Sequence, residues 1–138
     1  MQSLTQLVSL DLDSNDVGDI GVLSGFSGLV ELKLSGNGIS DISALTGLTE
    51  LEWLFLGGND VTDLGPLVGL TELWDLWLTN NANLTDIQPL IDNTGLGPRE
   101  VGAGPDPGDV VRLWGTSVSC SDIALLEAEG VVVISDCP

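Results

Sequence analysis

Leucine recurs every 22 residues through the first two thirds of this 138-residue chain. Three columns of leucine keep that interval, and a column of asparagine follows them at the same spacing. The leucine columns are Leu7, Leu29, Leu51 and Leu73; Leu10, Leu32, Leu54 and Leu76; and Leu12, Leu34, Leu56 and Leu78. So many positions in register indicate a stack of equivalent coils, in which each coil buries its apolar side chains against its neighbours.

Each column has a physical role. The middle Leu-x-Leu alternates with a period of two, as a short strand does when one of its faces is buried. The chain must then turn sharply, which leaves backbone N–H and C=O groups inside the turn. An asparagine amide has donors and an acceptor and can satisfy both kinds of group. We therefore assign a structural role to the asparagine column, which comprises Asn15, Asn37, Asn59 and Asn81.

An aspartate follows each of these asparagines at a short distance and precedes a short apolar run. Asp19, Asp41 and Asp63 keep the 22-residue interval, and one extra residue in the fourth unit moves the equivalent residue to Asp86. Aspartate is a preferred helix N-cap, so we expect it to cap a brief helical turn on the side opposite the strands. Pro66 and Pro89 fit the first turn of such a helix.

These repeats resemble leucine-rich repeats of the 22-residue class, the kind found in bacterial internalins. The segments that carry the resemblance are LVELKLSGNGISDISAL, LTELEWLFLGGNDVTDLGPL and LTELWDLWL, and it covers roughly residues 4 to 92. It implies an α/β solenoid: a leucine-rich repeat horseshoe with a parallel β-sheet on the concave face and short helical turns on the convex side. It also implies recognition of another macromolecule.

The remaining third departs from the repeat. We divide the chain into four repeats over residues 1–92, a Gly/Pro-rich loop over 93–108, and a fifth strand with a C-terminal helix-strand cap over 109–138. In the fifth coil Thr116 stands where the asparagine is expected. The segment SCSDIALLEAEG predicts a short helix that Ser119 or Ser121 caps and Gly130 ends, and VVVIS predicts a last strand.

The two cysteines, Cys120 and Cys137, flank this helix and strand. We expect a disulfide, which would contribute about 3 kcal/mol in the chain-entropy picture. Two reduced thiols are the alternative, and zinc is disfavoured because two Cys without His supply too few ligands. A disulfide, together with the resemblance, predicts an extracellular or cell-surface location.

The composition excludes several functions. With 21 Asp or Glu against 3 Lys or Arg the formal charge is −18, which argues against nucleic acid and anionic membranes as partners. The chain contains no His, and nothing marks a carboxylate as an acid catalyst, so we expect no enzymatic activity and no cofactor. Calcium is conceivable near Asp11, Asp13, Asp16 and Asp19, but the spacing is not that of an EF-hand, and a solvated acidic coil is preferred.

The strand pattern predicts which side chains face outward from the sheet. The central outward column is Asp11, Lys33, Phe55, Trp77, Arg112; the preceding one is Ser9, Glu31, Trp53, Asp75, Val110; the following one is Asp13, Ser35, Gly57, Thr79, Trp114. All four tryptophans thus fall at outward or rim positions. The predicted ligand-binding residues are Trp53, Phe55, Trp74, Trp77, Trp114, Asp75 and Arg112.

Several interpretations of this surface stay open. A protein partner, favoured by the acidic rim if it has a basic patch, is the first choice. Carbohydrate is the second, since sugars stack on aromatic rings, and a structural spacer within a larger secreted protein is the third. The rings could instead only stack on one another, or the loop 93–108 could cover them; Arg112 is expected to stack on Trp77 or Trp114.

Two further features remain as expectations. Nothing covers Leu7, Leu10 and Leu12 at the N-terminal end, so either the chain is a fragment of a longer protein or this end packs against another copy. The excess of acidic residues is also compatible with adaptation to salt.

Overall fold

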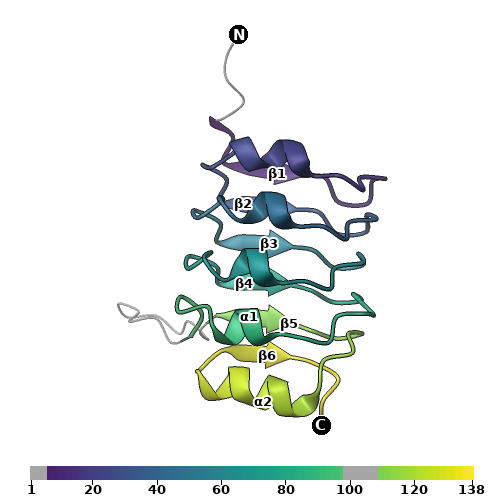
Figure 1. The fold of residues 1–138 in the computed structure, drawn as a ribbon, viewed down its shortest axis with the longest axis vertical. Coiled ribbons are helices and arrows are strands. Elements are labelled where there is room, and N and C mark those ends of the chain that lie inside the picture. The colour runs from purple at the N-terminus through teal and green to yellow at the C-terminus, as the bar shows by residue number, and fades with distance from the viewer. Residues whose placement is uncertain (1–5, 98–108) are drawn as a thin grey trace.

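Six short parallel strands run side by side in the computed structural model, which describes residues 6–97 and 109–138 (Figure 1). The strands are β1 (Ser9–Asp11), β2 (Glu31–Lys33), β3 (Trp53–Phe55), β4 (Asp75–Trp77), β5 (Val110–Arg112) and β6 (Val132–Ile134). They form one sheet in chain order, and Leu10, Leu32, Leu54 and Leu76 are register partners. The fold is the predicted leucine-rich repeat solenoid.

Short helical turns lie on the side of the coils opposite the sheet, stacked in the same order as the strands (Figure 1). They are η2 (Gly21–Gly25), η3 (Ser43–Leu45), η4 (Gly65–Leu67) and α1 (Gln88–Ile91). The first three are 3₁₀ turns. Pro66 and Pro89 lie in the first turns of η4 and α1, as expected from the fixed φ of proline.

The leucine columns form the core between the sheet and these turns. Leu32, Leu54 and Leu76 have no exposed surface, and the same is true of the other two columns from the second coil to the fourth. In the first described coil Leu7, Leu10 and Leu12 are only partly buried. The aliphatic interior is thus continuous along the stack and becomes more exposed at β1.

The asparagine column bonds consecutive coils to each other. The Nδ2 group of Asn59 donates to the carbonyl of Leu56 in its own coil and to that of Leu34 in the preceding coil, both at 2.9 Å. Its Oδ1 accepts from the backbone N–H of Ile39 at 3.1 Å. Asn37 and Asn81 repeat this arrangement, whereas Asn15 bonds only within its own turn.

The aspartates do not act as helix N-caps, so that prediction is wrong in its position. The N-cap residues are the apolar ones that follow, such as Ile42 before η3, and they make no side-chain capping bond. Asp41 lies one residue earlier and accepts from the N–H of Ser43 at 2.8 Å. The same two-residue bond recurs at the equivalent aspartates, namely Asp19, Asp63 and Asp86. Each aspartate therefore forms a local Asx turn that leads the chain into the helical turn.

The C-terminal coil ends the stack with a longer helix. α2 (Cys120–Ala128) begins after Ser119, whose hydroxyl accepts from the N–H of Asp122, and Gly130 follows its end with φ of 88°. The helix contacts both β6 and α1, and a disulfide joins Cys120 to Cys137 with Cα atoms 5.6 Å apart. The cap thus covers the last coil and also extends the sheet by one strand.

Two polar residues of the fourth and fifth coils are fully buried, which the sequence did not indicate. Asn93 is 2% exposed and its amide donates to the carbonyls of Leu67 and Leu70. Asp109 is 1% exposed and accepts from the N–H of Gly97. Thr116 replaces part of the missing asparagine by donating to the carbonyl of Leu113 at 2.7 Å. Most of the loop 93–108, and the idea that it covers the aromatic rings, lie outside the described residues.

Replacing Asn59 by Ala should destabilise the fold far more than the same change at Asn15. The first variant leaves the buried N–H of Ile39 without its acceptor, at a cost of about 1–3 kcal/mol. It also removes one of the two amide donors from each of the Leu34 and Leu56 carbonyls, which Asn37 and Asn81 still bond, so the total loss should be about 2 kcal/mol or more. Asn15 is exposed and water can replace its bonds, so its loss should cost less than about 1 kcal/mol. Urea unfolding measures both free energies; equal losses would contradict the cross-coil role.

Candidate functional site

Strand register places the predicted outward columns together on the sheet face. Asp11, Lys33, Phe55, Trp77 and Arg112 are successive register partners across β1 to β5, and Ile134 of β6 continues the row. The preceding column runs from Ser9 through Glu31, Trp53, Asp75 and Val110 to Val132. Because alternate residues of a strand point to opposite faces, these side chains share the face opposite the leucine core.

The aromatic rings lie in two contacting pairs on this face. The centroids of Trp53 and Trp74 are 5.6 Å apart with planes tilted by 44°, and those of Phe55 and Trp77 are 5.2 Å apart with a tilt of 55°. Tilted arrangements at these distances are favourable. The four rings form a group across β3 and β4 that we call the aromatic patch. Trp114 follows β5, is 51% exposed and belongs to neither ring pair.

Hydrogen bonds and an ion pair fix the rings of this patch. The Trp77 indole Nε1–H donates to Oδ1 of Asp75 at 2.9 Å, and the Arg112 guanidinium forms an ion pair with the same carboxylate. The guanidinium carbon of Arg112 lies 4.5 Å from the centroid of the Trp77 ring. Of the two rings considered for Arg112, the structure pairs it with Trp77. Asp75 and Arg112 therefore hold Trp77 in one orientation.

A second ion pair lies at the β1–β2 end of the sheet face. The Lys33 Nζ is 3.0 Å from Oε1 of Glu31 and 3.9 Å from Oδ2 of Asp11, and it lies 5.8 Å from the centroid of the Phe55 ring. The Ser9 hydroxyl donates to the other oxygen of Glu31 at 2.8 Å. The Lys33 and Ser9 bonds lower the pKa of Glu31, and the Glu31 carboxylate raises the pKa of Lys33.

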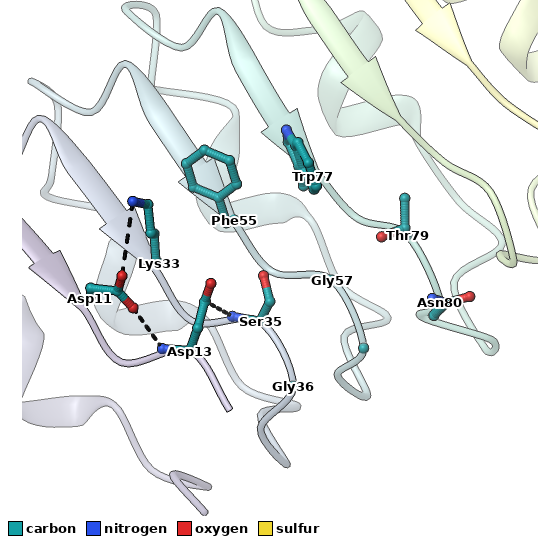
Figure 2. A pocket seen from close by; sticks show the side chains of 11 residues that line it. Asp11, Asp13, Lys33, Ser35, Gly36, Phe55, Gly57, Trp77, Thr79 and Asn80 are labelled. Carbon is teal, nitrogen blue, oxygen red and sulfur yellow. Dashed lines mark hydrogen bonds and ion pairs between the residues drawn. The ribbon is translucent and has the colours of Figure 1, made fainter. Parts of the chain in front are cut away.

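A shallow pocket of about 560 Å³ lies where the first four strands end, beside the aromatic patch. We call it the trough; its walls carry the side chains of Asp11, Asp13, Lys33, Phe55 and Trp77 (Figure 2). Gly36, Gly57 and Gly58 form its floor, and Thr79 and Asn80 close it on the β4 side. A second pocket of about 480 Å³ adjoins it over Glu31, Trp53 and Asp75 and shares Phe55 and Trp77 with it.

Glycine is required on the trough floor by geometry. Gly36 and Gly58 have φ of 67° and 65°, in the left-handed region that side chains disfavour. A Cβ atom on Gly57 would lie 2.8 Å from the Thr79 hydroxyl oxygen. The coils thus approach closely and leave the floor without side chains. In the sequence Gly57 is one position of an outward column, and the pair Gly57-Gly58 is the feature that corresponds to this pocket.

Neither metal binding nor a membrane-spanning helix finds support in the described part of the chain. Within residues 6–97 and 109–138 no cluster of three or more His, Cys, Asp or Glu side chains is placed to hold a metal ion. The aspartates of the first coil therefore form no such cluster. In the same residues no helix is both long and apolar enough to cross a membrane.

Family models identify the repeats. The model described as leucine rich repeat matches residues 5–61, and the model described as leucine rich repeats (2 copies) matches residues 49–92. No curated protein sequence gives a significant match. The fold and these matches define a leucine-rich repeat solenoid, a class of domain that generally mediates protein–protein interaction and acts as a non-catalytic scaffold.

Several solved structures are similar to this chain. An internalin (InlF) from Listeria monocytogenes is 31% identical with a TM-score of 0.76, and the match covers 97% of this chain and 37% of that protein. Internalin C2 from the same species is 32% identical with a TM-score of 0.76, and the match covers 96% of this chain and 53% of the internalin C2 chain. A leucine-rich repeat protein from Leptospira interrogans shares the fold at 24% identity and a TM-score of 0.76, covering 97% and 32%.

The chain belongs to the leucine-rich repeat family, with internalin-like repeats of 22 residues. It spans between 32% and 53% of the length of these three structures.

Replacing Lys33 by Met should raise the pKa of Glu31 towards its ordinary value of 4.5. Because the folded-state pKa is lowered, the stabilisation is present above the unfolded pKa and is lost as the pH falls through the folded value. Carbon-detected NMR of the Glu31 carboxyl measures the midpoint. Ser9→Ala should shift it in the same direction by less, since the Lys33 bond is the larger cause. An unchanged midpoint in the Lys33 variant would contradict the ion pair.

Proposed function

We propose that this chain is a non-catalytic recognition module that binds a protein partner through the aromatic patch on its concave sheet. The observation that carries the proposal is that all four tryptophans lie outside the core, whose buried apolar residues are Leu, Ile and Val. Exposed aromatic groups of this kind usually mark interaction sites, and Trp is enriched among the residues that dominate interface energies.

Ordering of the patch supports this proposal. Trp77 is held by Asp75 and Arg112, and Trp53 packs on Trp74, whose indole N–H donates to Glu52 at 3.4 Å. Side chains already fixed before binding lose little conformational entropy when a partner arrives. Trp77 nevertheless keeps 36% of its surface exposed. The mutual stacking considered above as an alternative to binding is thus compatible with it, since stacked rings still present area to a ligand.

Charge indicates the kind of protein partner. The rim of the sheet face carries the acidic side chains Asp11, Asp13, Glu31, Glu52, Glu72 and Asp75. Its two cations, Lys33 and Arg112, are paired with carboxylates of the same chain. A partner with a basic patch would be attracted to this face and would bind faster at low salt.

Carbohydrate remains the second candidate because carboxylates and an aromatic ring alternate from one strand to the next. Trp53 lies between two carboxylates in its row, because its register partners are Glu31 on β2 and Asp75 on β4. Such an arrangement allows a sugar ring to stack while its hydroxyl groups donate to carboxylates.

We further propose that the module works outside the cytoplasm. The disulfide between Cys120 and Cys137 closes the cap, and disulfides persist in oxidising compartments. The internalins of similar structure are named as proteins of Listeria monocytogenes, which makes a bacterial surface or secreted protein the natural assignment.

Replacing Trp53 and Trp77 together by Ala should abolish partner capture and leave the melting temperature within a few degrees. Val22→Ala is the matched control, because Val22 is 74% exposed but lies in η2, on the opposite side of the coils. A quantitative proteomic pull-down and a glycan array, each run with wild type and both variants, identify the ligand class. Equal capture by wild type and the Trp53/Trp77 variant, or a large fall in its melting temperature, would mean that the rings are structural.

A further inference from the structure

We propose that the trough is a specificity pocket for one arginine or lysine side chain of the partner. This inference rests on the proposed function and deepens it, because it assigns one chemical group to one place on the sheet face. The trough lies beside the aromatic patch, at the β1–β4 side of the molecule (Figure 2). A basic side chain entering it would meet carboxylates on one wall and rings on the other.

The two walls of the trough differ in chemistry. Asp11 and Asp13 lie at the β1 end, and Phe55 and Trp77 lie further along the row (Figure 2). A cation with an apolar stem fits this division, since the stem can pack on the rings while the head bonds the carboxylates. Neither an acidic nor a purely aliphatic side chain would use both walls.

The chain's own cations already use these ring faces. The Arg112 guanidinium lies 4.5 Å from the Trp77 centroid, and the Lys33 ammonium lies 5.8 Å from that of Phe55. Both rings therefore favour a cation in this electrostatic environment. Lys33 is the closer competitor of an incoming side chain, because it lines the trough itself.

Carboxylates remain for a second cation. Lys33 is paired mainly with Glu31, at 3.0 Å, and is only 3.9 Å from Asp11. The Asp11 side chain is 62% exposed. One oxygen of Asp13 accepts from the N–H of Ser35 at 2.6 Å, and one of Asp11 accepts from the N–H of Asp13 at 3.1 Å. These bonds fix one oxygen of each carboxylate, and the two negative charges exceed the one positive charge that Lys33 shares between Asp11 and Glu31.

The glycines below the trough let consecutive turns pack closely. Gly57 occupies an outward position of its coil, between Ser35 and Thr79, and Gly36 and Gly58 carry no side chain either. A Cβ atom at any of the three would meet the neighbouring coil, so glycine keeps the turns close together below the trough. The entering side chain lies in the open space between the two walls.

The test uses two blocked pentapeptides as probes, one with a single arginine flanked by glycines and one with citrulline in its place. Citrulline keeps the shape of arginine and removes its charge. Binding to the complete chain is followed by NMR shifts of the Trp77 indole N–H and the Gly57 and Gly58 amides, at physiological ionic strength so that the general field of the acidic protein is screened. We expect the arginine peptide to shift these signals and to bind at least about tenfold more tightly than the citrulline peptide.

Variants separate a pocket from a general charge effect. Asp11→Asn with Asp13→Asn keeps both acceptor oxygens but removes two charges, and should weaken arginine binding about tenfold. The control is Glu127→Gln with Glu129→Gln, which removes two charges at the end of α2 and should leave binding within about twofold. Lys33→Met removes the internal competitor and should strengthen arginine binding.

Three results would overturn the assignment: equal weakening by the two double variants, equal binding of both peptides, or shifts that lie away from the trough. The outcome is separable from that of the proposed function. Suppose that the Trp53/Trp77 variant loses its protein partner while the Asp11/Asp13 variant binds the arginine peptide as tightly as wild type does. The proposed recognition function is then supported and the proposed pocket is contradicted. If the probes behave as expected but no partner depends on the patch, the pocket stands and the proposed function fails.

Discussion

Hydrogen bonding by the asparagines of the three central coils is the interaction on which the rest of this structure depends. The amide of Asn59 bonds carbonyls of two consecutive coils and accepts an N–H from the earlier one. Its neighbours Asn37 and Asn81 do the same. This bonding fixes how far each coil is displaced from the last, so that leucine meets leucine in the core. A backbone turn that would otherwise bury unpaired groups becomes the connection between repeats.

The same displacement decides what the sheet presents to a ligand. Once the leucine columns are in register, the residues between them must also be in register, and rows of outward side chains result. Phe55 then contacts Trp77 on the neighbouring strand, and Trp77 contacts Arg112 on the strand after that. The aromatic patch and the trough are thus consequences of coil stacking: their residues are far apart in sequence and become neighbours only because every coil repeats the same path.

Much of this fold could be predicted from the sequence because its information is periodic. The interval between Leu10 and Leu32 gives the register directly, and with it the membership of the outward rows. Features that break the period could not be predicted. The burial of Asn93 and Asp109 depends on how the long fourth coil closes, and the Asx turn of Asp41 differs by one residue from the cap that we expected.

The sequence allowed the outward rows of the sheet to be predicted but not the contacts between their side chains. The sequence gives no means of deciding between Trp77 and Trp114 as the partner of Arg112, since both are close in the rows; the structure selects Trp77. Lys33 lies closer to Glu31 than to Asp11, and this difference depends on the reach of the side chains along one strand. The trough is lined in part by Gly57 and its neighbours, and glycines give no signal in a hydrophobic pattern. The pocket could therefore not be predicted from the sequence.

Acrylamide quenching of the intrinsic tryptophan fluorescence tests most directly the claim that the coils hold their indoles outside the core. The structure leaves Trp77 36% and Trp114 51% exposed, with Trp53 and Trp74 half-buried. The account predicts that the quencher reaches most of the native emission, and that Phe replacement of Trp77 and Trp114 removes the most accessible fraction. Native emission that resists the quencher until the protein is unfolded would contradict it.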